Sequence, residues 1–188
     1  LEIVDHYADQ LEARGAMENL AELRRQAAEV LRKALAKDSD GALLYRLART
    51  RLGLVRGRLR EGDLKGFGSE LAELDKLLGE LGGLSAYVEH TALMGAERRI
   101  LQAQDLADMG RRADVKKALE EAREGLDQVK LSALEPDRDF LQIRLEWAEA
   151  WMLEGTPKLA DIWDLAKRLE SLQEGSSGAY QRKLTAYR

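Results

Sequence analysis

The sequence predicts an all-α protein made of repeated helix pairs, and three observations carry the prediction. Hydrophobic residues make up 45% of the 188 residues and charged residues 34%, with Ala, Leu, Glu, Arg and Lys prominent. These residues lose little conformational freedom in a helix. Helix breakers and large rings are scarce, with 2 prolines and 5% aromatic residues. Glycines recur almost periodically, 47, 48 and 45 residues apart, at Gly15, Gly62, Gly110 and Gly155.

Each of these glycines follows one amphipathic segment and precedes another, where a residue that adopts the left-handed conformation ends a helix. Turn and capping residues supply a second set of breaks at 38–41, 82–85, 132–137 and 175–178. We therefore expect eight helices in four antiparallel hairpins, with a ninth helix from about Ala179. The expected pairs are 1–14 with 16–36, 41–61 with 64–81, 85–109 with 112–131, and 137–154 with 157–173.

The spacing of apolar residues within these segments is typical of helix rather than strand. In 112–131, Val115, Leu119, Ala122 and Leu126 recur three or four residues apart, and charged residues occupy the other positions. Ser85 and the pair Thr156-Pro157 are typical of helix starts. Gly53 and Gly57, four residues apart inside one helix, predict close approach by a neighbouring helix.

The hairpins resemble the tetratricopeptide repeat, which has small and bulky residues in its first helix, glycine at the turn and small residues in its second helix. The first-helix positions are Ala8, Val55, Ala103 and Ala148, followed by Leu11, Arg58, Leu106 and Trp151. The second-helix positions are Leu20 and Ala27, Phe67 and Leu74, Val115 and Ala122, and Ala160 with Trp163 or Ala166. The period exceeds the family's usual value of about 34 residues, as in longer-helix variants from bacterial signal-sensing regulators, and HEAT-type repeats are the alternative.

The resemblance implies a right-handed α-α superhelix, a solenoid of about four antiparallel hairpins plus a C-terminal helix. One domain would then cover 1–188, with repeats at 1–37, 41–82, 85–131 and 137–174 and an extra helix at 179–188. Because the sequence begins at Leu1 and has no stop signal before Arg188, we expect a fragment of a larger protein.

Composition argues against several classes of function. The 30 basic and 34 acidic residues give a net charge of −4, which disfavours direct nucleic-acid binding. No apolar run approaches the roughly 20 residues of a membrane-spanning helix. There is no cysteine, and His6 and His90 stand alone, without ligand or triad spacing. We expect no enzymatic activity, cofactor or metal, and the cytoplasm as the default location.

The helix over 41–60 is the main candidate binding surface. It carries six arginines, Arg46, Arg49, Arg51, Arg56, Arg58 and Arg60, and no acidic residue. Arg49, Arg56 and Arg60 fall along one side, where their planar guanidinium groups could bind an acidic peptide. The alternative interpretation is an internal salt-bridge face, paired with Glu2, Asp5, Asp9 and Glu12 of the first hairpin.

Further candidate partner-binding positions are Gln104 in the third repeat and Gln142, Leu145, Glu149 and Met152 in the fourth. Trp147, Trp151 and Trp163 could stack on a ligand, but large rings of one hairpin are more typical of a core, and we expect them to be buried.

These observations predict a protein-interaction scaffold or sensor that binds a peptide or partner domain in a concave groove. The alternative is a small-molecule effector module of a bacterial signalling or transcription regulator. A third possibility is a structural spacer that self-associates through 179–188, where Tyr180, Leu184 and Tyr187 lie on one side.

Overall fold

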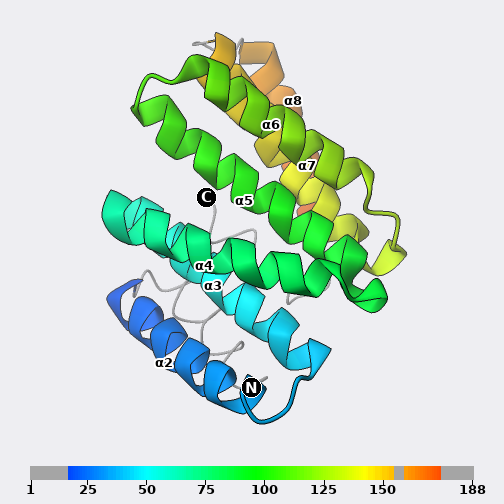
Figure 1. Ribbon diagram of the computed structural model, residues 1–188. Helices are drawn as coiled ribbons and strands as arrows, with labels where there is room; N and C mark the ends of the chain where they lie inside the picture. The colour runs from blue at the N-terminus through cyan, green and yellow to red at the C-terminus, as the bar shows by residue number, and fades with distance from the viewer. Residues whose placement is uncertain (1–16, 155–158, 175–188) are drawn as a thin grey trace. The chain divides into compact units, whose positions relative to one another are not determined.

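The computed structural model describes residues 17–154 and 159–174, and within those ranges the protein is helical, without any β-strand (Figure 1). The predicted all-α class is therefore confirmed. The contacts divide the chain into two compact units, the first ending at Tyr87 and the second beginning at Val88. The expected helices at 1–14 and 179–188 lie outside the described residues.

The first unit contains three consecutive helices and a short 3₁₀ turn. They are α2 (Met17–Leu35), α3 (Gly41–Glu61), α4 (Leu64–Gly82) and η1 (Ser85–Tyr87). Helix α3 packs against α2 on one side and α4 on the other (Figure 1). Buried residues of α2 and α3 form a shared cluster of Ala28, Leu31, Leu47 and Leu54. Burial of this apolar surface holds α2 on α3, because each removes the other's apolar face from water.

Side-chain caps fix where two of these helices begin. The Asp40 carboxylate accepts a hydrogen bond from the Ala42 backbone N–H at 3.0 Å, and the Asp63 carboxylate accepts one from Gly66 at 2.9 Å. Each bond satisfies a backbone donor that the first helical turn leaves without an intrahelical acceptor. These caps explain why α3 and α4 start beside the predicted turns.

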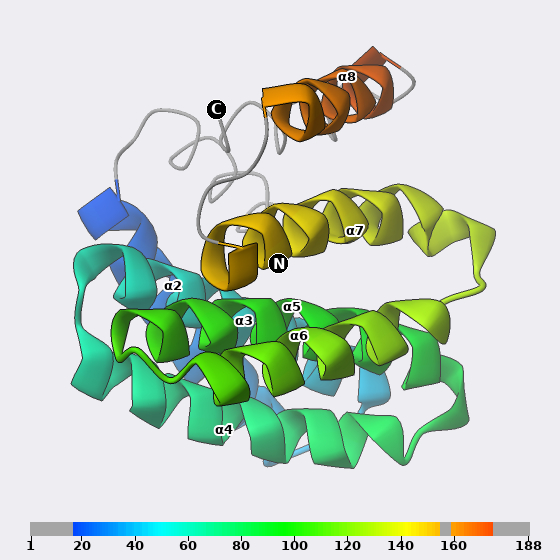
Figure 2. The same ribbon diagram turned by 90° about the horizontal axis from the view of Figure 1, so that it is seen from above.

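The second unit contains four α-helices, one of which ends in a π-helical turn. They are α5 (Val88–Asp108), α6 (Arg112–Asp127), α7 (Glu135–Glu149) and α8 (Leu159–Glu174), with the 3₁₀ turn η2 (Ser132–Leu134) before α7 and the π-helical turn η3 (Ala150–Glu154) after it. Helix α7 lies between α8 and the α5–α6 hairpin (Figure 2). Ile100, Leu119 and Leu145, one from each of α5, α6 and α7, lie in one buried cluster.

The glycine turns form as predicted where the structure describes them. Gly62 and Gly110 have φ angles of 70° and 72°, the left-handed conformation that ends α3 and precedes α6. Gly15 and Gly155 lie outside the described residues. The regular spacing of glycine therefore marks true helix ends in the second and third hairpins.

Several predicted boundaries were wrong by a few residues. Ser85 begins a 3₁₀ turn, and the α-helix starts at Val88. Helix α6 ends at Asp127 rather than 131, because the chain leaves the helix at Gln128 while Val129 remains buried. The first helix of the fourth hairpin starts at Glu135, since a proline fits the first turn of a helix.

The prediction that the tryptophans form a core was wrong. Trp147, Trp151 and Trp163 are 40%, 49% and 61% exposed. The buried side of α7 is formed by smaller residues, and Leu145, which we expected to contact a partner, is 0% exposed. The fourth hairpin packs through aliphatic residues, and its largest side chains face outward.

Candidate functional site

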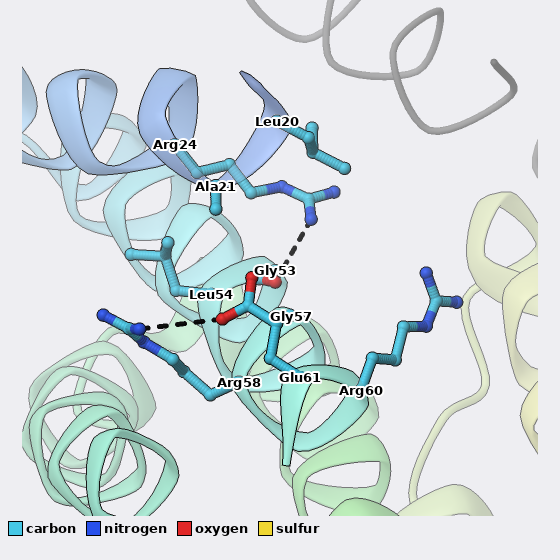
Figure 3. A pocket seen from close by; sticks show the side chains of 9 residues that line it. All are labelled: Leu20, Ala21, Arg24, Gly53, Leu54, Gly57, Arg58, Arg60 and Glu61. Atoms are coloured by element: carbon cyan, nitrogen blue, oxygen red, sulfur yellow. Dashed lines mark hydrogen bonds and ion pairs between the residues drawn. The ribbon is translucent and has the colours of Figure 1, made fainter. Parts of the chain in front are cut away.

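The first unit contains a pocket of about 130 Å³ between the start of α2 and the second half of α3 (Figure 3). Three of its lining residues are arginines. The lining residues are Leu20, Ala21, Arg24, Gly53, Leu54, Gly57, Arg58, Arg60 and Glu61. The pocket thus combines cationic groups with an apolar wall and a patch of bare helix backbone.

Two glycines of α3 create that bare patch. A Cβ atom on Gly53 would lie 2.6 Å from Arg24 Nε, closer than two such atoms can approach, whereas a Cβ on Gly57 would have no neighbour within 4 Å. Gly53 therefore admits the Arg24 side chain, and Gly57 leaves open space beside it. The predicted close approach at this pair is confirmed for Gly53, where the approaching group is a side chain of α2.

Arg24 is held in place by the helix that it approaches. Its Nη1 donates a hydrogen bond to the Gly53 carbonyl oxygen at 3.1 Å. Figure 3 shows the guanidinium group reaching across from α2 toward this carbonyl. The hydrogen bond places a positive charge at the edge of the pocket.

The other charged lining residues come from the last turn of α3. Arg58 Nη1 lies 3.6 Å from a Glu61 carboxylate oxygen and 2.9 Å from a carboxylate oxygen of Asp63. Figure 3 shows the Glu61 carboxylate turned toward Arg58, and Arg60 extending on the other side of the pocket. Partly exposed ion pairs contribute only about 0–1 kcal/mol, so the Arg58–Glu61 contact adds little to stability.

One of the three predicted arginines lines this pocket. Arg60 is exposed at its rim. Arg49 is exposed farther back along α3, where its guanidinium carbon lies 5.8 Å from the centre of the Tyr45 ring. Arg56 is half-buried and is not among the lining residues. The predicted surface is therefore divided, and of its three arginines Arg60 is the one that lines the pocket between α2 and α3.

Part of the arginine run makes ion pairs with acidic residues of its own hairpin, while the pairing with the first hairpin that the alternative interpretation expects stays a prediction. Arg51 Nη1 lies 2.7 Å from a carboxylate oxygen of Glu70 on α4, and both side chains are largely buried. The expected partners Glu2, Asp5, Asp9 and Glu12 lie outside the described residues. Arg51 thus joins α3 to α4.

The remaining predicted binding residues belong to the second unit. Gln104 is half-buried on α5. The Gln142 side-chain amide donates a hydrogen bond to Glu146 at 3.0 Å. Glu149 accepts from Arg123 on α6 through both carboxylate oxygens at 2.6 Å, and this bond raises the pKa of Arg123. The carboxylate of Glu149 is thus engaged between α6 and α7, while partner binding at these three positions stays a prediction.

Arg24, Arg58 and Glu61 are lining residues that the sequence analysis did not select. The spacing of Gly53 and Gly57 was their signal, because two glycines on one helical face leave space for a neighbour's side chain. Arg24 could not be assigned from the sequence, since the rotation of α2 about its axis decides which of its charged residues faces α3.

No group of three or more histidine, aspartate or glutamate side chains within 17–154 and 159–174 is placed to hold a metal ion. None of the described helices α2 to α8 is long and apolar enough to cross a membrane.

No family model, no curated protein and no solved structure matches this chain. Its function is therefore inferred from the pocket between α2 and α3.

Proposed function

We propose that this protein is a non-catalytic interaction module that binds an acidic peptide segment of a protein partner. The proposal rests on three arginines, Arg24, Arg58 and Arg60, which line one pocket beside the Gly53–Gly57 surface, with Arg58 and Arg60 on opposite sides of it (Figure 3). In this proposal the hairpins are tetratricopeptide-like and stack as a right-handed superhelix. The pocket then receives one carboxylate of the bound segment.

The chemistry of the pocket favours a carboxylate. Arginine presents several N–H donors in a plane, which matches the two oxygens of a carboxylate, and hydrogen bonds between charged groups are stronger than neutral ones. Three arginines and one acidic residue line the pocket, and basic groups still outnumber acidic ones when Asp63, whose carboxylate lies 2.9 Å from Arg58, is counted. Glu61 occupies the place that we assign to the ligand's carboxylate, as a surface group that is readily displaced.

The apolar lining favours a peptide over a free inorganic anion. Leu20, Ala21 and Leu54 lie beside the cationic groups. A peptide can place an apolar side chain on this wall while an adjacent acidic residue binds arginine. Burial of that side chain adds affinity that a small hydrated anion does not gain.

The size of the pocket favours a peptide side chain over a small-molecule effector. Sites for drug-sized ligands enclose about 300–1,000 Å³. The 130 Å³ here suits a single carboxylate and its stem. This volume supports the scaffold hypothesis over the regulatory module that binds a metabolite.

Fluorescence anisotropy with two labelled peptides tests the proposal. In one peptide leucine alternates with glutamate, and in the other leucine alternates with glutamine. We expect the glutamate peptide to bind the wild-type protein at least tenfold more tightly, and Arg60→Gln to weaken its binding about tenfold, equivalent to about 1.4 kcal/mol. Arg49→Gln is the matched control, because Arg49 is an exposed arginine of the same helix outside the pocket.

Two results would overturn the proposal. Equal affinity for the two peptides would exclude carboxylate recognition, and an equal loss in Arg60→Gln and Arg49→Gln would indicate attraction to the whole helix rather than to the pocket. Circular dichroism melts should show that both variants retain the fold, because both positions are exposed.

A further inference from the structure

The second unit exposes two tryptophans that lie side by side. The rings of Trp147 and Trp151 have their centres 6.0 Å apart, with their planes inclined by 57°. The two side chains are 40% and 49% exposed. Tryptophan is among the residues most enriched at the energetic centres of protein interfaces.

Helix packing does not require these rings. Helix α7 buries Leu141, Leu145 and Ala148 on the side that faces the core. Arg144 forms a separate link, lying 2.9 Å from a carboxylate oxygen of Glu97 on α5. The core-facing side of α7 is thus aliphatic, and the tryptophan pair keeps a large part of its surface exposed.

The backbone changes from α-helix to π-helix next to the tryptophan pair. Trp151 lies in the π-helical turn η3, which continues α7 directly. Arg112 on α6 donates a hydrogen bond to the Leu153 carbonyl oxygen within this turn. The turn is thus tied to α6 and holds Trp151 beside Trp147.

The charge of the surrounding unit indicates the kind of partner. Acidic residues outnumber basic ones in each of α5, α6, α7 and α8. Such an excess produces a negative potential that attracts cationic segments and repels acidic ones. The face of an indole ring also attracts cations, and tryptophan does so most strongly among the aromatic residues.

We infer that the Trp147–Trp151 pair docks a basic peptide segment of a partner protein, with an arginine or lysine side chain lying against the two indole rings. The negative potential of the unit brings the segment in, and the rings hold its cationic group and the aliphatic stem beside it. The inference is independent of the proposed function, because it concerns the other unit and the opposite charge.

A fluorescence titration tests this docking surface directly, because all 3 tryptophans of the chain lie in the second unit. The probe is a peptide in which leucine alternates with arginine, and the comparison peptide replaces arginine with glutamine. We expect only the arginine peptide to change the tryptophan emission. Because the substitutions themselves alter emission, the variants are compared by the anisotropy of labelled peptides.

Trp147→Leu and Trp151→Leu should each weaken binding of the arginine peptide about tenfold. Trp163→Leu is the matched control, since Trp163 is an exposed tryptophan of the same unit on a different helix, and it should change the affinity less than twofold. Thermal melts by circular dichroism establish that each variant is folded.

Three results would overturn the inference: equal binding of the glutamine peptide, an equal loss in Trp163→Leu, or an unchanged affinity in both variants of the pair. Light scattering tests whether a second copy of this chain occupies the tryptophan surface instead. A mass above the 21.1 kDa of one chain that falls to the monomer in Trp147→Leu would make a second copy, not a basic partner, the occupant of this surface.

Discussion

Arg24 Nη1 lies 3.1 Å from the carbonyl oxygen of Gly53, and this hydrogen bond joins α2 to α3 at the edge of the pocket. A side chain at position 53 would occupy the space of the Arg24 guanidinium group. Gly53 therefore makes room for Arg24, although glycine inside a helix lowers the stability of that helix. In the proposed function, this contact fixes one of the three cationic groups that line the pocket.

Replacing the two glycines should separate stability from binding. Gly57→Ala adds a methyl group in open space and should stabilise the protein by up to about 1 kcal/mol. Gly53→Ala gains the same propensity but displaces Arg24, so we expect less stabilisation and at least a fivefold loss of affinity for the glutamate peptide. Urea unfolding and anisotropy measure the two effects. A larger gain in stability for Gly53→Ala than for Gly57→Ala would contradict the described contact.

Glu61→Gln should increase affinity for the acidic peptide about three- to fivefold. The substitution removes the carboxylate that lies 3.6 Å from Arg58 and competes with the ligand for the pocket. Glu80→Gln is the charge-matched control, because Glu80 is exposed on α4 and does not line the pocket. Titration calorimetry compares the two variants. If both raise the affinity equally, the effect reflects net charge rather than competition.

The buried pair formed by Glu97 and Arg144 provides a test of the second unit. Their side chains are 9% and 17% exposed, and the pair joins α5 to α7 at 2.9 Å. Glu97→Ala leaves the Arg144 charge without this carboxylate and should lower the free energy of unfolding by about 3 kcal/mol. Glu97→Gln keeps a hydrogen-bond acceptor and should cost less. Urea unfolding measures both, and a loss below about 1 kcal/mol in Glu97→Ala would contradict the burial of the pair.

Asp105 should make stability depend on pH in the direction opposite to most carboxylates. Burial, and to a lesser extent the nearby charge of Asp108, raises the pKa of Asp105 above its usual value, and its Oδ1 is buried without a hydrogen bond. The folded state therefore binds the proton more readily than the unfolded state. At neutral pH the charged carboxylate of Asp105 therefore destabilises the folded state. This destabilisation disappears as the pH falls through the raised pKa and the carboxyl becomes neutral.

Asp105→Asn removes this charge and should raise the melting temperature at pH 7. The difference from the wild-type protein should shrink as the pH is lowered through the folded-state pKa of Asp105, where the wild-type carboxyl becomes neutral. Calorimetric melts from pH 7 to pH 4 follow this trend. A variant that is less stable than the wild-type protein at pH 7 would show that the carboxylate is needed in its charged form.

The fold class and most helix positions could be predicted because their signals are local. The Arg-rich helix was predicted at 41–61 and is found at Gly41–Glu61, between the Asp40 cap and the left-handed Gly62. Capping, turn glycines and apolar spacing act within a few residues and can be read from a single chain. The prediction that the tryptophans are buried was wrong because residue size does not determine which side of α7 packs against its neighbours.

The pocket could be predicted only in part. The arginine run was visible, but each arginine's role depends on which helix faces it. Arg51 meets Glu70 on α4, Arg49 lies over Tyr45, and Arg60 borders the pocket. The contribution of Arg24 comes from α2 and follows from the packing of the two helices.

The central claim is that an acidic peptide binds in the pocket between α2 and α3. Its most direct test is to map the binding site by the changes in amide chemical shifts during an NMR titration with the glutamate peptide. We expect the largest changes on α2 near Leu20 and Arg24 and on α3 from Gly53 to Glu61, and we expect them to disappear with the glutamine peptide. Changes spread evenly over exposed basic residues, or concentrated outside these segments, would contradict a carboxylate site between α2 and α3.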